Sequence, residues 1–226
     1  MEENHWLSCK MVKVLGLDEA GRGPVLGPMI IAGAMIEEGR EAMLGEVKDS
    51  KLIRHKQRII LSENIKKQTK YEIIIVEPKE IDEALLSETL NLNWLEAHKQ
   101  AEIINKLKPD VAIVDCPSIN ESGFKKYLQD LLDNKNIKLI VEHKADVEYP
   151  ICSAASILAK VERENQMDKI KEKYGNTGPG YPSNKTTQDF VKKNWNKPEC
   201  SSIMRKTWST YKKAAKGKSQ MKITYF

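Results

Sequence analysis

The fold of this chain is decided by the stretch Met11-Val12-Lys13-Val14-Leu15-Gly16-Leu17-Asp18-Glu19-Ala20-Gly21-Arg22-Gly23. Its first seven residues are mostly apolar, which predicts a buried strand over residues 11–18. Two adjacent carboxylates then stand at the end of the strand, where they repel each other unless a cation binds there. The Gly-Arg-Gly sequence predicts a turn whose backbone N–H groups a ligand can approach closely. We therefore expect a metal site beside a site that binds a ligand through main-chain groups.

The composition is that of a globular protein, with 226 residues of which 40% are hydrophobic and 31% charged. Charge is unevenly distributed along it. Residues 1–159 hold 21 Lys and Arg against 26 Asp and Glu, a net charge of −5, whereas residues 160–226 hold 16 against 6, a net charge of +10. An acidic body with a basic C-terminal third predicts a polyanionic partner. A solvated lysine surface is the alternative interpretation.

The cysteines and the apolar segments exclude several classes of protein. The four cysteines are far apart and include no C-x-x-C pair, so neither a zinc cluster nor a disulfide framework is expected. Reduced thiols of a cytosolic protein are the simplest interpretation. The longest apolar stretch, residues 25–36, is too short to span a membrane, and the N-terminus lacks a signal pattern. We expect a cytoplasmic protein with no membrane partner.

Strand and helix patterns alternate in the second half of the chain. Strands are predicted at residues 11–18, 29–36, 71–76, 111–115 and 137–142. Helices are predicted at residues 54–67, 92–107, 121–133, 151–174 and 186–216. Pro150 can open the long fourth helix and Gly175 can close it. These elements predict an α/β fold with a mixed sheet, followed by a basic, mobile tail from residue 212.

Carboxylates recur at the predicted strand ends. Asp115 ends the strand at residues 111–115, and Asp146 follows the fifth strand. If these ends share one edge of the sheet, both converge with Asp18 and Glu19, and the cluster needs cations. Oxygen ligands favour Mg²⁺ or Mn²⁺ over zinc, and two such ions about 4 Å apart can promote phosphodiester hydrolysis. Any one of these acidic residues could simply be a turn residue, since Asp is common in turns. Four carboxylates that all lie at or just after predicted strand ends favour a metal site.

Six motifs follow one another along residues 11–208. They are Asp18-Glu19-Ala20-Gly21-Arg22-Gly23-Pro24, Lys48-Asp49-Ser50-Lys51, Val114-Asp115, His143-Lys144-Ala145-Asp146, Ala154-Ala155-Ser156-Ile157-Leu158-Ala159-Lys160 and Gly180-Tyr181-Pro182-Ser183. In this order they resemble ribonuclease HII, the type 2 ribonuclease H, and the compact length resembles the archaeal members. The resemblance implies a ribonuclease H-like fold with a mixed five-stranded sheet flanked by helices. It also implies a catalytic core over residues 1–150, a C-terminal helical region over residues 151–211 that completes the substrate cleft, and a basic tail over residues 212–226.

The same resemblance implies a divalent-metal endonuclease. Its substrates would be the RNA strand of RNA/DNA hybrids and ribonucleotides embedded in duplex DNA, cut on the 5′ side to leave a 3′-hydroxyl and a 5′-phosphate. The metal-binding carboxylates of the family carry over to Asp18, Glu19, Asp115 and Asp146. Mg²⁺ or Mn²⁺ would be the cofactor.

The resemblance to the family also implies which residues bind the substrate. In the family, the turn Gly21-Arg22-Gly23 and a tyrosine, here Tyr181, read the ribonucleotide 2′-hydroxyl, which can both donate and accept a hydrogen bond. Phosphate contacts are expected from Lys51, Ser153 and Lys160. The alternatives are loop anchoring for Tyr181 and a solvated surface for the lysines. We expect Trp208 to pack, and Asn184 stands where the family often has an acidic residue.

The C-terminus resembles a short sliding-clamp-binding peptide. Its pattern is Gln220-x-x-Ile223-x-x-Phe226, in which an aliphatic and an aromatic side chain could enter a pocket of the clamp. An unstructured end, or a strand packed on the body, is the alternative. We expect a monomer.

Two other functions stay open from the sequence. The first is another ribonuclease H-fold nuclease such as ribonuclease HIII, which usually carries an extra N-terminal domain and a different pattern at the glycine turn. The second is a non-catalytic module that binds nucleic acid or a clamp through the basic C-terminal third. The carboxylates argue against that module, because unpaired acids in a DNA-binding cleft repel phosphate.

Overall fold

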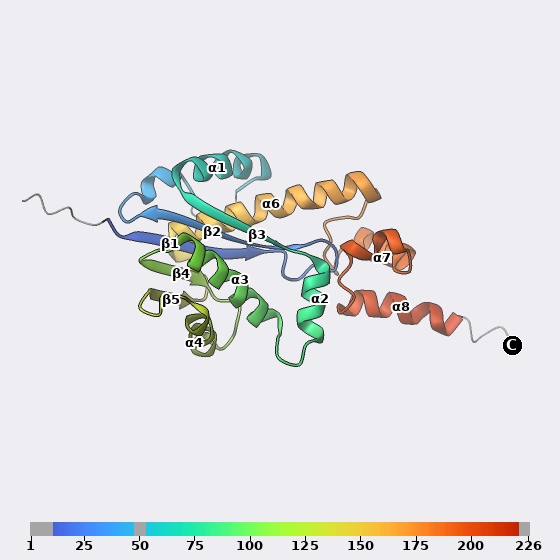
Figure 1. Ribbon diagram of the computed structural model, residues 1–226. Coiled ribbons are helices and arrows are strands. Elements are labelled where there is room, and N and C mark those ends of the chain that lie inside the picture. Colours follow the sequence, from blue (N-terminus) through green and yellow to red (C-terminus); the bar gives the residue numbers. More distant parts are fainter. Residues whose placement is uncertain (1–10, 48–52, 222–226) are drawn as a thin grey trace, which may run out of the picture.

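A five-stranded mixed sheet forms the centre of the molecule, as predicted (Figure 1). The computed structural model describes residues 11–47 and 53–221. The strands are β1 (Lys13–Ala20), β2 (Met29–Glu37), β3 (Lys70–Val76), β4 (Val111–Asp115) and β5 (Lys138–Glu142), in the order β3-β2-β1-β4-β5. β1 and β2 pair antiparallel, as do β2 and β3, whereas β1, β4 and β5 run parallel to one another.

The first strand extends farther than its sequence pattern indicates. We expected it to end at Asp18, but Glu19 and Ala20 also pair with β2, opposite Ile31 and Ile30. The predicted C-terminal end of this strand was wrong, because hydrogen bonding with β2, and not the end of the apolar run, determines where the strand ends. Glu19 therefore follows the alternation of β1, and its side chain points to the sheet face opposite that of Asp18.

One face of the sheet is covered by α3 (Leu92–Leu107) and α4 (Glu121–Leu131), with α2 (Pro78–Leu86) beside α3. The core on this face joins Leu15 and Leu17 of β1 to Ile103 of α3 and Phe124 of α4. Asn91 and Asn120 cap the N-termini of α3 and α4 through their side chains. The sequence pattern predicted α3 and α4 but not α2.

The long helix α6 (Pro150–Tyr174) lies across the other face, over β1 and β2, with α1 (His55–Gln68) packed beside it (Figure 1). The short helices η1 (Glu41–Leu44) and α5 (Ala145–Glu148) lie next to α6. Gly16 permits the close approach of helix and sheet, because a Cβ there would come within 2.4 Å of the Ile151 carbonyl carbon. The sheet thus holds α6 directly above β1.

The C-terminal region, predicted to be helical over residues 186–216, is divided into three elements. It consists of α7 (Lys185–Asn194), the 3-10 helix η2 (Pro198–Ile203) and α8 (Ser209–Met221). Pro198 has no N–H to continue α7, and the residues between η2 and α8 form a loop. The tail expected to be mobile from residue 212 is helical through Met221, because Tyr211 and Ala214 pack on the third core cluster.

This third cluster joins the segment after the glycine turn to the C-terminal helices. Val25 and Leu26, which follow the glycine turn, pack with Phe190, Val191 and Met204. Leu26 also forms an antiparallel bridge with Met204. The C-terminal helices therefore cover the segment between β1 and β2. The division of the chain into a catalytic core and a C-terminal region at residue 150 stays a prediction.

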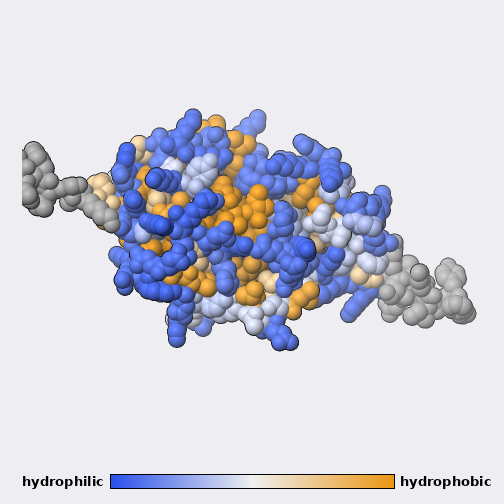
Figure 2. All heavy atoms as spheres, viewed as in Figure 1, coloured by the Kyte–Doolittle hydropathy of each residue, from blue (hydrophilic) through white to orange (hydrophobic). Residues whose placement is uncertain are grey.

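The visible face is mostly hydrophilic, with a hydrophobic band across its middle (Figure 2). The band overlies the region of β3 in Figure 1, and Tyr71 and Ile75 of that edge strand are among the exposed large hydrophobic residues. Among the helices of the described residues, none has the length and apolar character needed to cross a membrane.

Candidate active site

Three of the four predicted carboxylates meet at one edge of the sheet. One carboxylate oxygen from each of Asp18, Asp115 and Asp146 lies within 4.8 Å of the others. Asp18 and Asp115 converge because β1 and β4 are parallel neighbours whose carboxyl ends share an edge. Asp146 is brought in by α5, whose preceding residue Lys144 has a left-handed backbone with φ of 62°. The Ala145 N–H donates to Asp115 Oδ1 over 3.0 Å, which ties α5 to β4.

Burial disfavours the charged forms of these carboxylates when no cation is bound. Desolvation raises the pKa of Asp18 to about 7, and the charge of Asp115 adds to the shift. The Ser156 hydroxyl, the Glu19 N–H at 2.7 Å and the charge of Lys160 oppose the rise in this pKa. Crowded, buried carboxylates with oxygen-only donors are the environment that a hard divalent cation stabilises. The residues present therefore fit Mg²⁺ or Mn²⁺.

Glu19 lies beside this cluster rather than inside it. Its side chain faces α3, and Glu19 Oε2 is buried without a hydrogen-bond partner among the described residues. Desolvation first, then the charges of Glu96 and Asp18, raise the pKa of Glu19 well above its usual value. We expected four carboxylates to converge. In this structure three of them do, and the side chain of Glu19 lies on the opposite face of β1.

The glycine turn follows β1 directly. Gly21 has φ of 85°, and a Cβ on it would lie 2.5 Å from Arg163 Cδ, so only glycine fits there. The Arg22 guanidinium reaches α3, where it pairs with the Glu96 carboxylate and donates to Asn93 Oδ1 over 2.6 Å. By contrast, a Cβ on Gly23 would have open space around it. The arginine side chain points into the protein, and the second glycine stays accessible.

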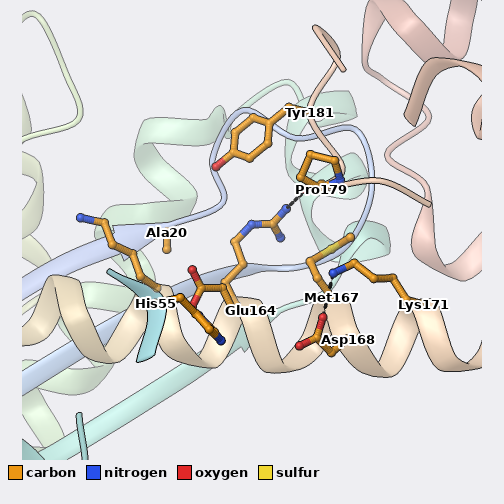
Figure 3. Close-up of a pocket in the computed structure, with 10 residues that line it drawn as sticks. Ala20, His55, Glu164, Met167, Asp168, Lys171, Pro179 and Tyr181 are labelled. Atoms are coloured by element: carbon orange, nitrogen blue, oxygen red, sulfur yellow. Dashed lines mark hydrogen bonds and ion pairs between the residues drawn. The ribbon is translucent and has the colours of Figure 1, made fainter. Parts of the chain in front are cut away.

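A pocket of about 400 Å³ adjoins the turn, between α6 and the loop that precedes α7 (Figure 3). Tyr181 and Pro179 line its loop side, and Glu164 of α6 and His55 of α1 line the opposite side. The Arg163 guanidinium lies 5.9 Å from the centre of the Tyr181 ring and donates to the carbonyl of Pro28 over 2.7 Å. Tyr181 is 45% exposed, so its ring is accessible to a ligand in this pocket.

The phosphate-binding candidates have different surroundings. Lys160 lines the same pocket, and its charge acts on Asp18. Ser153 is buried, and its hydroxyl donates to the carbonyl of Val47. That bond holds the residue directly before the segment 48–52, which contains Lys51 and lies outside the described residues. Ser153 thus contacts the main chain of Val47, and its contact with phosphate stays a prediction.

The clamp-binding candidates lie at the end of the described chain. Gln220 belongs to the last turn of α8, whereas Ile223 and Phe226 lie outside the described residues. The structure thus leaves the clamp motif as a prediction.

Several site residues were not identified from the sequence. Glu96 and Gln100 are fully buried on the sheet side of α3, and Arg163 is buried beside the glycine turn. A signal for the first two was present, because polar residues at positions 96 and 100 share a helix face with the apolar Leu92 and Ile103. Two polar residues on an apolar helix face indicate that polar side chains are buried there.

The family model described as Ribonuclease HII matches residues 15–211 of this chain. The chain belongs to the ribonuclease HII family. It is 41% identical over 208 residues to Ribonuclease HII of Methanosphaera stadtmanae, covering 90% of this chain and 95% of that protein. It is also 39% identical to Ribonuclease HII of Archaeoglobus fulgidus, over 86% of this chain and 93% of that one.

Solved structures of ribonuclease HII proteins have the same fold. The crystal structure of ribonuclease H2 from Pyrococcus horikoshii matches with a TM-score of 0.81 and 38% identity, over 91% of this chain and 98% of that one. A PCNA:RNase HII complex from Archaeoglobus fulgidus matches with a TM-score of 0.79 and 37% identity, over 88% and 96% of the two chains. A ribonuclease HIII in complex with Mn²⁺ has a TM-score of 0.76 at 18% identity and shares the fold.

Membership in the ribonuclease HII family establishes the class of reaction. The protein is a metal-binding endonuclease, a hydrolase that acts on the RNA strand of RNA/DNA hybrids. This excludes the non-catalytic module, and the family match decides against ribonuclease HIII. The acidic triad of Asp18, Asp115 and Asp146 lies where divalent metals would be held.

Proposed function

We propose that the protein also cuts duplex DNA on the 5′ side of embedded ribonucleotides and leaves a 3′-hydroxyl and a 5′-phosphate. Asp18, Glu19, Asp115 and Asp146 would hold Mg²⁺ or Mn²⁺ for this reaction. The observation that carries the proposal is the position of the acidic triad, whose Asp18 stands near the end of β1, three residues before the first glycine of the Gly-Arg-Gly turn. Metal-binding groups and exposed main-chain groups are thus within a few residues of each other.

The chemistry is divided between the metal and the chain. When bound, the divalent cations would lower the pKa of the attacking water and neutralise charge on the leaving oxygen. Asp18 and Asp115 would hold the metal, because both carboxylates project from paired strands of a rigid sheet. Asp146 would complete the site from α5. Lys160 on α6 would bring a positive charge to the phosphate beside Asp18.

Discrimination of a ribonucleotide requires contacts with its 2′-hydroxyl. The N–H groups of the turn and the exposed Tyr181 side chain would provide them, since Tyr181 lines the pocket together with Ala20, the residue directly before the turn. A deoxynucleotide would leave the polar groups of the turn without this partner, which disfavours its binding. Lys51 would contact phosphate, and Ser153 would support the segment that carries it.

A labelled duplex with one ribonucleotide tests this function directly. With Mg²⁺ we expect a single cut on the 5′ side of the ribonucleotide, no cut with EDTA, and no cut in the matched all-DNA duplex. The upstream product should be extended by a DNA polymerase, because its end is a 3′-hydroxyl. Cleavage of a long RNA/DNA hybrid without any cut at the single ribonucleotide would refute the proposed specificity and leave the family activity intact.

We also propose that the C-terminal peptide with Gln220, Ile223 and Phe226 binds a sliding clamp. The support is its motif together with the solved PCNA complex of the relative from Archaeoglobus fulgidus. A monomer in the cytoplasm is the state that we expect for the enzyme, and light scattering of the purified protein tests the first part.

A further inference from the structure

Three consecutive carbonyl groups of the glycine turn accept hydrogen bonds from side chains near the end of the chain. Arg205 Nη2 donates to the Gly21 carbonyl over 2.6 Å, and Arg205 Nη1 donates to the Arg22 carbonyl over 2.7 Å. Trp208 Nε1 donates to the Gly23 carbonyl over 2.9 Å. Two side chains from one loop therefore hold every carbonyl of the turn.

The arginine of this pair is fully buried and rigidly held. Arg205 has 0% exposure, and its Nε and Nη2 also donate to the Gly27 carbonyl over 3.1 and 3.0 Å. Burying a guanidinium costs free energy unless its donors find acceptors, and here three backbone carbonyls supply them. The Arg205 guanidinium carbon also lies 4.9 Å from the centre of the Trp208 ring, so the two side chains support each other.

A carboxylate on α2 fixes the loop that carries both side chains. Asp82 is buried and accepts from the N–H of Lys206 over 2.7 Å and from the N–H of Thr207 over 3.0 Å. It also accepts from the Thr207 hydroxyl over 2.5 Å. The positions of Arg205 and Trp208 thus depend on α2 as well as on the C-terminal helices.

This arrangement determines which main-chain groups of the turn stay available. The carbonyl and the N–H of one trans peptide unit point in opposite directions. Because the Gly21 and Arg22 carbonyls face Arg205, the N–H groups of Arg22 and Gly23 face the other way. Within the described part of the chain, no backbone carbonyl accepts a hydrogen bond from either N–H. The third peptide unit ends at Pro24, which has no N–H.

We propose that Arg205 and Trp208 are positioning residues for substrate recognition. They hold the three carbonyls so that the N–H groups of Arg22 and Gly23 face the 2′-hydroxyl of the strand that is cut. The inference rests on the proposed role of the turn, and neither side chain needs to touch the substrate. The C-terminal loop thereby sets the selectivity of a turn that lies far away in the sequence.

The test compares two tryptophan variants. Trp208→Phe keeps an aromatic ring and removes the donor to Gly23 together with part of the indole ring system. Trp195→Phe is the matched control, because Trp195 lies in the same region and its Nε1 has no hydrogen-bond partner among the described residues. Steady-state cleavage of an RNA/DNA hybrid, binding of an all-DNA duplex of the same sequence, and thermal unfolding are measured for both variants and the wild type.

We expect Trp208→Phe to raise KM for the hybrid about fivefold with kcat nearly unchanged, the effect of losing one ordinary hydrogen bond that supports ground-state binding. Its affinity for all-DNA duplex should equal that of the wild type, and Trp195→Phe should match the wild type in every assay. Arg205→Lys, which loses the planar fork but keeps the charge, should raise KM further.

Two results would overturn the inference. One is a Trp208→Phe variant with the same KM as Trp195→Phe. The other is an equal loss of affinity for hybrid and for all-DNA duplex, which would mean a general structural role. If the wild type cuts the hybrid but not a single ribonucleotide, the proposed specificity fails, while the KM comparison on the hybrid still decides the role of Trp208.

Discussion

The carboxylate of Glu96 on α3 pairs with the guanidinium of Arg22, the middle residue of the glycine turn. Glu96 has 0% side-chain exposure, and burial raises its pKa to about 7, an effect that the charge of Arg22 opposes. Arg22 is therefore held from inside the protein and serves as an anchor for the turn.

Breaking this buried pair should destabilise the protein. Glu96→Ala leaves the guanidinium without its carboxylate partner, so we expect the free energy of unfolding to fall by about 2–3 kcal/mol. This is less than for a wholly buried pair because Arg22 is partly exposed and keeps its bond to Asn93. Glu80→Ala is the control, since Glu80 forms a partly exposed ion pair with Lys99 and its loss should cost less than about 1 kcal/mol. Urea unfolding measures both, and equal losses would contradict a structural role for Glu96.

Removing one carboxylate of the triad should separate catalysis from folding. Asp18→Asn should show no detectable cleavage of an RNA/DNA hybrid, while it binds the hybrid and unfolds at no lower temperature than the metal-free wild type. The reason is that asparagine removes a buried charge beside Asp115 without a change in size. Hybrid cleavage at the wild-type rate would eliminate this site.

Metal binding should be visible without any assay of activity. Mn²⁺ at about one hundred times its Kd should raise the unfolding temperature of the wild type by roughly 5–10 °C, because a ligand that binds only the folded state stabilises it. The same Mn²⁺ should have a much smaller effect on Asp18→Asn. Equal shifts in the two proteins would place the metal elsewhere.

Two glycines should respond in opposite ways to an added methyl group. Gly23→Ala has open space for its Cβ, so the fold should be unaffected, whereas cleavage should fall at least about tenfold because the methyl group blocks approach to the turn. Gly16→Ala should lower stability by about 3 kcal/mol or prevent folding, since its Cβ would meet the backbone of α6. Circular dichroism and hybrid cleavage distinguish the two, and an active Gly23→Ala would speak against substrate contact at the turn.

The thiol of Cys152 should be unreactive in the folded protein. The thiol lies on α6 against β1, and burial raises its pKa well above the usual value. Little thiolate therefore forms at about pH 8. Iodoacetamide followed by peptide mass analysis should find Cys152 unmodified in the native protein and modified in urea. Rapid labelling under native conditions would mean that α6 separates from β1.

Deletion of residues 220–226 should abolish binding to a sliding clamp and leave hybrid cleavage unchanged, because the acidic triad lies far from them in sequence. Calorimetry with the clamp of a related archaeon measures the first effect. Phe226→Ala should act like the deletion. An undiminished affinity in the truncated protein would rule out the motif.

The parts of the fold that depend on local patterns were predictable from the sequence. Alternating strands and helices predicted the five-stranded mixed sheet, and carboxylates at strand ends predicted the meeting of Asp18, Asp115 and Asp146. The position of Glu19 was predicted less well, because the length of β1 depends on its pairing with β2. Strand alternation then places Glu19 on the other face.

Long-range contacts were not visible in the sequence. We expected Trp208 to pack, and it does lie against two core clusters, but its bond to the Gly23 carbonyl crosses 185 residues. Asn184, which departs from the family pattern, accepts from the Thr187 N–H over 3.0 Å and caps α7. Capping is a local role that an aspartate would also perform, so this departure is explained by the structure.

The hydrogen bonds between Arg205 and the turn also constrain when the enzyme becomes active during its synthesis. Residues 11–23 leave the ribosome early, whereas the donors that orient the turn lie 184 residues later than Gly21. A nascent chain can already contain every proposed metal-binding carboxylate while its substrate-reading turn still lacks the partners of its carbonyls. With the role proposed for Arg205 and Trp208, selective cleavage would begin only after translation has passed Trp208. A truncated product that ends earlier would carry the acidic cluster without the donors that orient the turn.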